Sequence, residues 1–186
     1  MERRIKTGLR TISVVIFVLF FYVFLHESGH TIVALASGSK ITEFDLFSTR
    51  PHMNYKGGNY TLFSTLWLHA NGAFLPLFVS YIVAFTYKKE IRSFFYQAFC
   101  FFFCVINTLS FLVWAVVPVL YMNGYMDKSE DAFKFSDLFF MYQDPRIISV
   151  FALLLVGLGA MLIFWKGIPY QYFQYVSGLP EKDAAA

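Results

Sequence analysis

Charged residues are scarce in this chain of 186 residues, of which only 15% are Asp, Glu, Lys or Arg. Soluble domains contain about a quarter of such residues, so the composition excludes an ordinary water-exposed globular fold. In contrast, 58% of the residues are hydrophobic, 21% are aromatic, and the mean hydropathy is +0.55. These values predict an all-α integral membrane protein with a single domain over residues 1–186.

Three further scarcities narrow the class of protein. The net charge is only +3, and the basic residues lie at membrane flanks, so nucleic acid is excluded as a partner. The only two cysteines, Cys100 and Cys104, lie four residues apart in an apolar run, where one helix face cannot easily close a disulfide. We therefore expect both to pack. No small-residue cleavage site follows the first apolar segment, so we expect that segment to be retained.

Four apolar segments are long enough to cross a membrane as helices. They cover residues 11–36, 62–87, 94–121 and 146–165. The basic residues divide nine to six between the two sides, and the larger number lies on the side of the amino terminus. The positive-inside rule then predicts a multi-pass protein of the cell membrane, in contact with the lipid bilayer, with both termini in the cytoplasm.

The first polar loop, residues 38–59, contains a stretch that alternates in character from Ile41 to Phe47. In a strand with this alternation, the residues two positions before and two positions after Phe44 lie on the same face as Phe44. Hairpin-type turn residues follow at Gly57 and Gly58. This pattern predicts either a short β-hairpin at the membrane edge or an ordinary connection.

The second polar loop, residues 122–145, predicts an amphipathic helix from about residue 129 to 142. On one face of this helix Glu130 and Lys134 have the spacing of an ion pair exposed to solvent. The other face is apolar and carries Asp131 together with Phe135 and Tyr142. Asp131 is therefore the acidic residue that we expect to point toward the rest of the protein.

The first apolar segment contains the sequence LHESGH, from Leu25 to His30. On a helix His26 and His30 project from one face, and Glu27 lies within the same arc. This is the H-E-x-x-H arrangement, in which two imidazoles bind Zn²⁺ and a carboxylate beside the open position deprotonates a water. Ionisable groups inside an apolar helix cost about 2.5 to 3.5 kcal/mol each at mid-bilayer, so they need partners or a function. We predict zinc binding and hydrolytic chemistry.

A catalytic zinc usually has three protein ligands and a water, so one ligand remains to be found. Both polar loops emerge on the side of the membrane nearest the motif, which favours Asp131. His69, in the second apolar segment, lies close to the depth of His26 if each residue rises about 1.5 Å. Either residue fits as the third ligand. If His69 is not a ligand, we expect it to hydrogen-bond a ligand, to bind substrate or to pack between helices.

Two asparagines in the apolar segments are further candidates. Asn107 also falls near the level of the metal, where it would hold a substrate carbonyl or oxyanion, or else make an interhelical hydrogen bond. Asn71 belongs to a polar patch of the second segment that we expect to face protein rather than lipid. We include Asn71 among the candidates for substrate or oxyanion binding.

These motifs resemble the site-2 protease group of intramembrane zinc metalloproteases, particularly its small single-domain members. The matching positions are Leu25 to Thr31, Gly38, Ile41 to Phe47, Ala70 to Ala73, and then Asn107, Pro118 and Asp131 in order. The resemblance implies a zinc endopeptidase that cuts a membrane-embedded or membrane-proximal protein or peptide. It also implies Asp131 as third ligand, Asn107 in the place of the family's asparagine, and an edge strand that holds the substrate extended.

The chain departs from this pattern around the aspartate. In the family that residue is often followed by glycine and comes shortly after a proline, whereas Asp131 precedes Ala132 and lies thirteen residues beyond Pro118. The alternative function is a catalytically inactive metal-binding membrane protein that binds or sequesters a peptide or partner. Membrane di-iron enzymes need several pairs of histidines, and this chain has four histidines in total.

Overall fold

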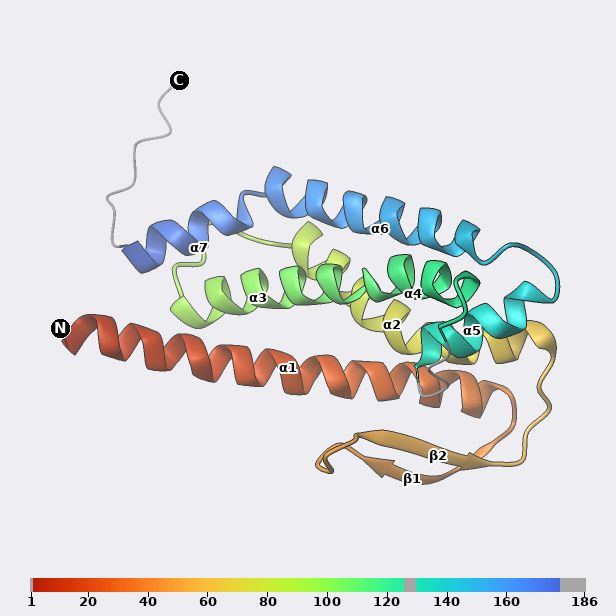
Figure 1. Cartoon of the computed structure of the whole chain (residues 1–186). Coiled ribbons are helices and arrows are strands. Elements are labelled where there is room, and N and C mark those ends of the chain that lie inside the picture. Colours follow the sequence, from red (N-terminus) through yellow and green to blue (C-terminus); the bar gives the residue numbers. More distant parts are fainter. Residues whose placement is uncertain (1, 126–129, 178–186) are drawn as a thin grey trace.

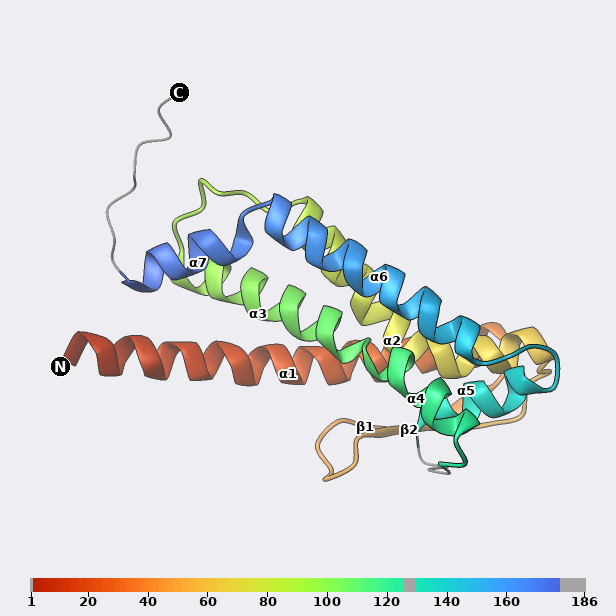
Figure 2. The same cartoon turned by 45° about the horizontal axis from the view of Figure 1, so that its top comes forward.

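The computed structural model describes residues 2–125 and 130–177, and most of these residues are helical (Figure 1). The helices are α1 (Glu2–Ala36), α2 (Leu62–Phe85), α3 (Phe94–Ser110), α4 (Val113–Met122), α5 (Asp131–Phe140), α6 (Arg146–Trp165) and α7 (Ile168–Ser177). The strands are β1 (Lys40–Asp45) and β2 (His52–Lys56), which form a two-stranded antiparallel sheet. The amino terminus and α7 lie at one end of the bundle, and the hairpin and α5 lie toward the other (Figures 1 and 2).

Among the described residues, four helical segments are long and apolar enough to cross a membrane. They are Ile5–Ala36, Leu62–Phe85, Phe94–Met122 and Arg146–Trp165. The four predicted apolar helices are thus confirmed, with the fourth at its predicted bounds. Helix α1 begins at Glu2 rather than near residue 11, because Gly8 is the only glycine or proline in the basic flank. Helix α2 begins after Thr61, whose side chain accepts a hydrogen bond from the Ser64 backbone.

The third apolar segment is two helices rather than one, because it is interrupted after Ser110. The Ser110 hydroxyl donates to the Asn107 carbonyl oxygen at 3.0 Å, and that carbonyl is the acceptor that a continuing α-helix would need for the Phe111 N–H. The following bonds are of the tighter three-residue type, from Leu112 to Leu109 and from Trp114 to Phe111. The chain therefore changes direction between α3 and α4, as Figure 2 shows.

The predicted hairpin is confirmed, but its turn is formed by residues 46–51 rather than by Gly57 and Gly58, which follow β2. Both glycines have positive φ and belong to the connection to α2. The register shifts between Ile41 and Glu43, and this bulge breaks the simple alternation expected of the strand. As a result, Ile41 packs against residues of α1 and α2, and Phe44 contacts Phe24 of α1.

The predicted amphipathic helix of the second loop is present as α5, and its preceding cap is Glu130. Residues 126–129, where we expected the helix to begin, lie outside the described residues. The buried face is formed by Ala132, Phe133 and Ser136, so the predicted apolar face is displaced, and Tyr142 is exposed. The reason is that α5 packs on α2 and α4 through its small residues as well as its rings.

Several clusters of buried side chains hold the helices together. One joins α2, α4, α5 and α6 and includes Trp114 and Phe133. Another joins α1, α3 and α7 and includes Val18, Phe103 and Tyr172. Helix α7 is therefore packed against the bundle, with Ile168 and Tyr172 buried. Both cysteines are free and buried, as predicted.

Candidate metal centre

Helices α1 and α2 approach closely beside the H-E-x-x-H motif because glycine lies on both sides of the contact. A Cβ atom on Gly29 would overlap the Asn71 backbone carbonyl, and one on Gly72 would overlap the imidazole of His30 and lie 2.9 Å from that of His26. The Asn71 side-chain amide donates to the Gly29 carbonyl oxygen at 2.8 Å. Small residues and a buried amide are typical of close contacts between membrane helices.

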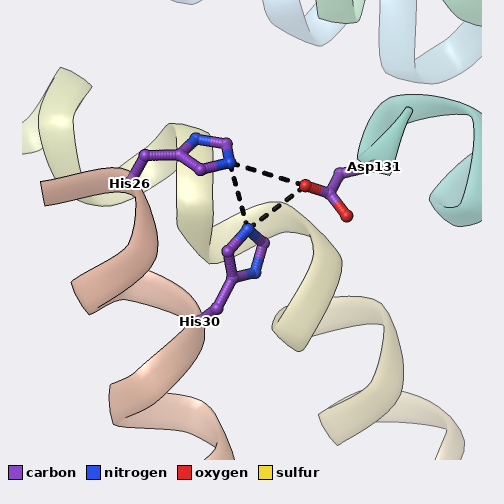
Figure 3. Close-up of side chains that lie close together, drawn as sticks. All are labelled: His26, His30 and Asp131. Carbon is purple, nitrogen blue, oxygen red and sulfur yellow. Dashed lines mark hydrogen bonds and ion pairs between the residues drawn. The ribbon is translucent and has the colours of Figure 1, made fainter. Parts of the chain in front are cut away.

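Three side chains from two separate elements converge at this point (Figure 3). His26 and His30 project from α1, and Asp131 projects toward them from the start of α5. The His26 and His30 Nε2 atoms are 3.1 Å apart, and Asp131 Oδ2 lies 3.1 Å from His30 Nε2 and 3.5 Å from His26 Nε2. The structure thus brings together His26, His30 and Asp131, and of the two candidates for the third ligand it places Asp131 rather than His69 in the converging group.

The dimensions of this triangle fit a tetrahedral cation. An ion with bonds of about 2.0–2.1 Å to nitrogen and oxygen holds its ligand atoms about 3.3 Å apart, between the shortest and longest observed edges. Three atoms with lone pairs repel one another at these distances unless a cation or protons lie between them. Within residues 2–125 and 130–177 this is the one group of His, Cys, Asp and Glu side chains that converges in this way.

The ring orientation of His30 is fixed by a backbone carbonyl. His30 Nδ1 lies 2.7 Å from the Leu68 carbonyl oxygen, which can only accept a hydrogen bond, so Nδ1 carries the hydrogen. In the neutral ring Nε2 then presents its lone pair to the other two side chains, as a metal ligand requires. His26 Nδ1 is buried and has no hydrogen-bond partner within the part of the chain that the structure describes.

The second oxygen of Asp131 has partners of its own. His69 Nδ1 lies 3.2 Å from Oδ1, and Lys134 Nζ lies 3.6 Å from the same atom. Lys134, expected to pair with Glu130, therefore pairs with the neighbouring acid. Burial raises the pKa of Asp131, but the imidazoles of His26, His30 and His69 outweigh it and hold that pKa well below its usual range. Asp131 is accordingly a carboxylate, the form that binds metal.

Glu27 is buried at 7% exposure and lines the same cavity as the three converging side chains. The cavity has a volume of about 540 Å³. Other parts of its lining were missed from the sequence, namely Tyr22, Ser110, Trp114 and the hairpin residues 51–53 and 55. Tyr22 was detectable, because it precedes His26 by one helical turn on the same face. The hairpin residues were not, because only the tertiary fold places β2 over the cavity.

The two asparagines lie apart from the cavity lining. Asn107 is 1% exposed, its amide donates to the Phe103 carbonyl oxygen at 2.6 Å, and its Oδ1 atom has no hydrogen-bond partner among the described residues. Asn71 lies in the contact between α1 and α2 described above. His69 faces the cavity and contacts Asp131. His52 also lines the cavity, with its side chain 42% exposed, and lies 3.4 Å from Glu43.

A second cavity, of about 340 Å³, adjoins the first and is lined by apolar side chains of α2, α4, α5 and α6 and by Phe111. Trp114 belongs to both linings and so separates the polar cavity from the apolar one.

Comparison of the chain with protein-family models, with curated protein sequences and with solved structures yields no match.

Proposed function

We propose that this protein is an intramembrane zinc metalloprotease of the site-2 protease type, with His26, His30 and Asp131 as the metal ligands. The observation that carries the proposal is the triangle of two imidazole nitrogens and one carboxylate oxygen, which lies beside the buried carboxylate of Glu27. Two nitrogens and one oxygen at this spacing suit Zn²⁺ and leave a fourth position for water or substrate. The absence of a cysteine from the group disfavours a softer metal.

Glu27 is the residue to which we assign proton transfer. Its carboxylate accepts a proton from a water as the water oxygen attacks the carbonyl carbon of the scissile peptide bond. The same proton then passes to the leaving nitrogen as the carbon–nitrogen bond breaks, which yields one carboxyl group and one amine. When bound, Zn²⁺ supplies Lewis acidity that lowers the pKa of water and polarises a carbonyl. The surrounding apolar helices keep bulk water away and strengthen these interactions.

The surroundings of the cavity support a membrane-embedded or membrane-proximal polypeptide as substrate. Three of the four apolar segments contribute residues to the cavity that holds the site, and the fourth lines the adjoining apolar cavity, which fits hydrophobic side chains. A substrate helix must expose its backbone before hydrolysis, because its carbonyl groups are otherwise bonded within the helix. The charge bias supports a multi-pass location in the cell membrane with both termini in the cytoplasm.

The test combines metal content with cleavage by the full chain in membranes. We expect purified protein to contain Zn²⁺, and we expect its expression to generate new protein amino termini that mass spectrometry detects. Glu27→Gln should retain the metal and lower cleavage by about 10²- to 10⁴-fold, because only the general base is lost. Glu90→Gln is the matched control, since Glu90 is exposed between α2 and α3 and lines neither cavity.

Two outcomes would count against the proposal. Cleavage that survives Glu27→Gln would remove Glu27 from the chemistry. A protein that binds Zn²⁺ and carries out its cellular role equally well with Gln at position 27 would be a metal-dependent binding protein rather than a peptidase.

A further inference from the structure

Asp131 needs more positioning than the two histidines. His26 and His30 lie in the middle of a 35-residue helix, whereas Asp131 is the first residue of a ten-residue helix. Its carboxylate has two equivalent oxygens, and its side chain can rotate, so the ligand atom is not selected by the backbone alone. Further contacts of the carboxylate must determine which of its oxygens turns toward His26 and His30.

The contacts of Asp131 Oδ1 determine the orientation of the carboxylate. His69 Nδ1 and Lys134 Nζ both lie near Oδ1, at 3.2 Å and 3.6 Å, whereas Oδ2 is the atom near the two imidazoles. Because a carboxylate can only accept, His69 donates from Nδ1. His69 is also on α2, the helix that Gly29 and Gly72 hold tightly against α1. The donor is therefore fixed relative to the two histidine ligands.

We propose that His69 is a positioning residue that holds Asp131 Oδ1, so that Oδ2 alone is presented to the metal, with Lys134 as a weaker second contact. His69 acts through its Nδ1 hydrogen and not as a ligand itself, since none of its atoms belongs to the converging group. Lys134 contributes less because its side chain is 41% exposed and its contact is longer. The inference rests on the proposed metal site.

Zinc affinity of the full chain in detergent micelles tests this role, measured by competition with a chromophoric chelator. We expect His69→Ala to weaken Zn²⁺ binding by about 10- to 100-fold, the usual effect of removing a group that orients a ligand. His69→Asn should restore most of the affinity, because its side-chain nitrogen lies as many bonds from Cβ as Nδ1 does. His52→Ala is the control, since His52 lines the same cavity but contacts Glu43 and Arg50.

Thermal unfolding separates positioning from a structural role. The metal-free melting temperature should be similar in the wild type and in His69→Ala, and the increase on adding Zn²⁺ should be smaller in the variant. Unchanged zinc affinity in His69→Ala would overturn the inference, and so would a loss confined to the metal-free stability. An affinity as low in His69→Asn as in His69→Ala would show that His69 acts through Nε2. A wild-type chain that binds no Zn²⁺ would instead overturn the proposed function.

Discussion

The two halves of the candidate metal centre are held in different ways. On one side, α1 and α2 meet at two glycines and a buried amide, so that His26 and His30 are placed by close backbone packing. On the other side, Asp131 comes from a short helix that packs on α2 and α4 and is aimed by polar contacts. The histidine pair is thus fixed by shape, and the aspartate is fixed by hydrogen bonding and by the docking of α5.

This difference predicts how substitutions disrupt each half of the candidate metal centre. Close packing between long helices fails through steric overlap and affects the stability of the whole bundle. A docked short helix fails through loss of buried area, which affects the third ligand while leaving the first two in place. Substitutions on each side can therefore be compared by two measurements, the free energy of unfolding and the affinity for Zn²⁺.

The largest effect should follow from undocking α5. Phe133 is 3% exposed and packs against Tyr121, so Phe133→Ala should cost about 3–5 kcal/mol of docking free energy. We expect Zn²⁺ affinity to fall, because Asp131 is no longer held near the two imidazoles, and we expect the remaining helices to stay folded. Phe140→Ala, the same change at a position that is 52% exposed, should leave the affinity nearly unchanged. Equal zinc affinity in Phe133→Ala and the wild type would contradict the comparison.

A smaller effect, on the free energy of unfolding rather than on the affinity for Zn²⁺, should follow from separating α1 and α2. Gly29→Ala places a methyl group against the Asn71 carbonyl and should lower the free energy of unfolding by about 1–3 kcal/mol. Chemical unfolding in micelles measures this change. Gly157→Ala is the matched control, because its added methyl group meets no described atom within 4 Å apart from its chain neighbours and the nearby backbone of its own helix, and alanine favours the helix. If both variants unfold alike, the close glycine contact does not determine stability.

The smallest effect concerns the hairpin that covers the cavity. The Arg50 carbonyl and then the Glu43 carboxylate raise the pKa of His52 above its ordinary value. The contact is therefore complete below about pH 6.5 and is lost as the pH rises through the folded-state pKa. Glu43→Gln should lower the pKa of His52 without removing the contribution of Arg50. Titration of the His52 ring by NMR measures the shift, and an unchanged value would exclude Glu43 as a cause.

The features predicted from sequence are those that depend on local pattern. Hydrophobic runs predicted the four apolar helical segments, and helical periodicity predicted that His26, His30 and Glu27 share one side of α1, where all three line the same cavity. The acidic residue on an otherwise apolar face indicated Asp131, and the structure places it beside both histidines. Membrane insertion, zinc binding and peptide hydrolysis remain predictions.

The features that sequence reasoning missed depend on contacts between distant segments. The break after Ser110 arises from a side chain that competes with the backbone, which apolar composition does not reveal. The turn of the hairpin was misplaced because Gly57 and Gly58 have turn chemistry but serve the connection to α2. The contact between His69 and Asp131 joins residues 62 positions apart, so spacing along the chain could suggest a similar depth but not a hydrogen bond.

The separation of the ligands along the chain has a consequence for biosynthesis. His30 leaves the ribosome about a hundred residues before Asp131, and domains generally fold in that order during synthesis. A nascent chain that already contains α1 and α2 therefore has only the two imidazoles of the converging group, and the Asp131 carboxylate arrives after α3 and α4 have been made. The group of His26, His30 and Asp131 is thus completed late, when most of the surrounding helices are available to shield it.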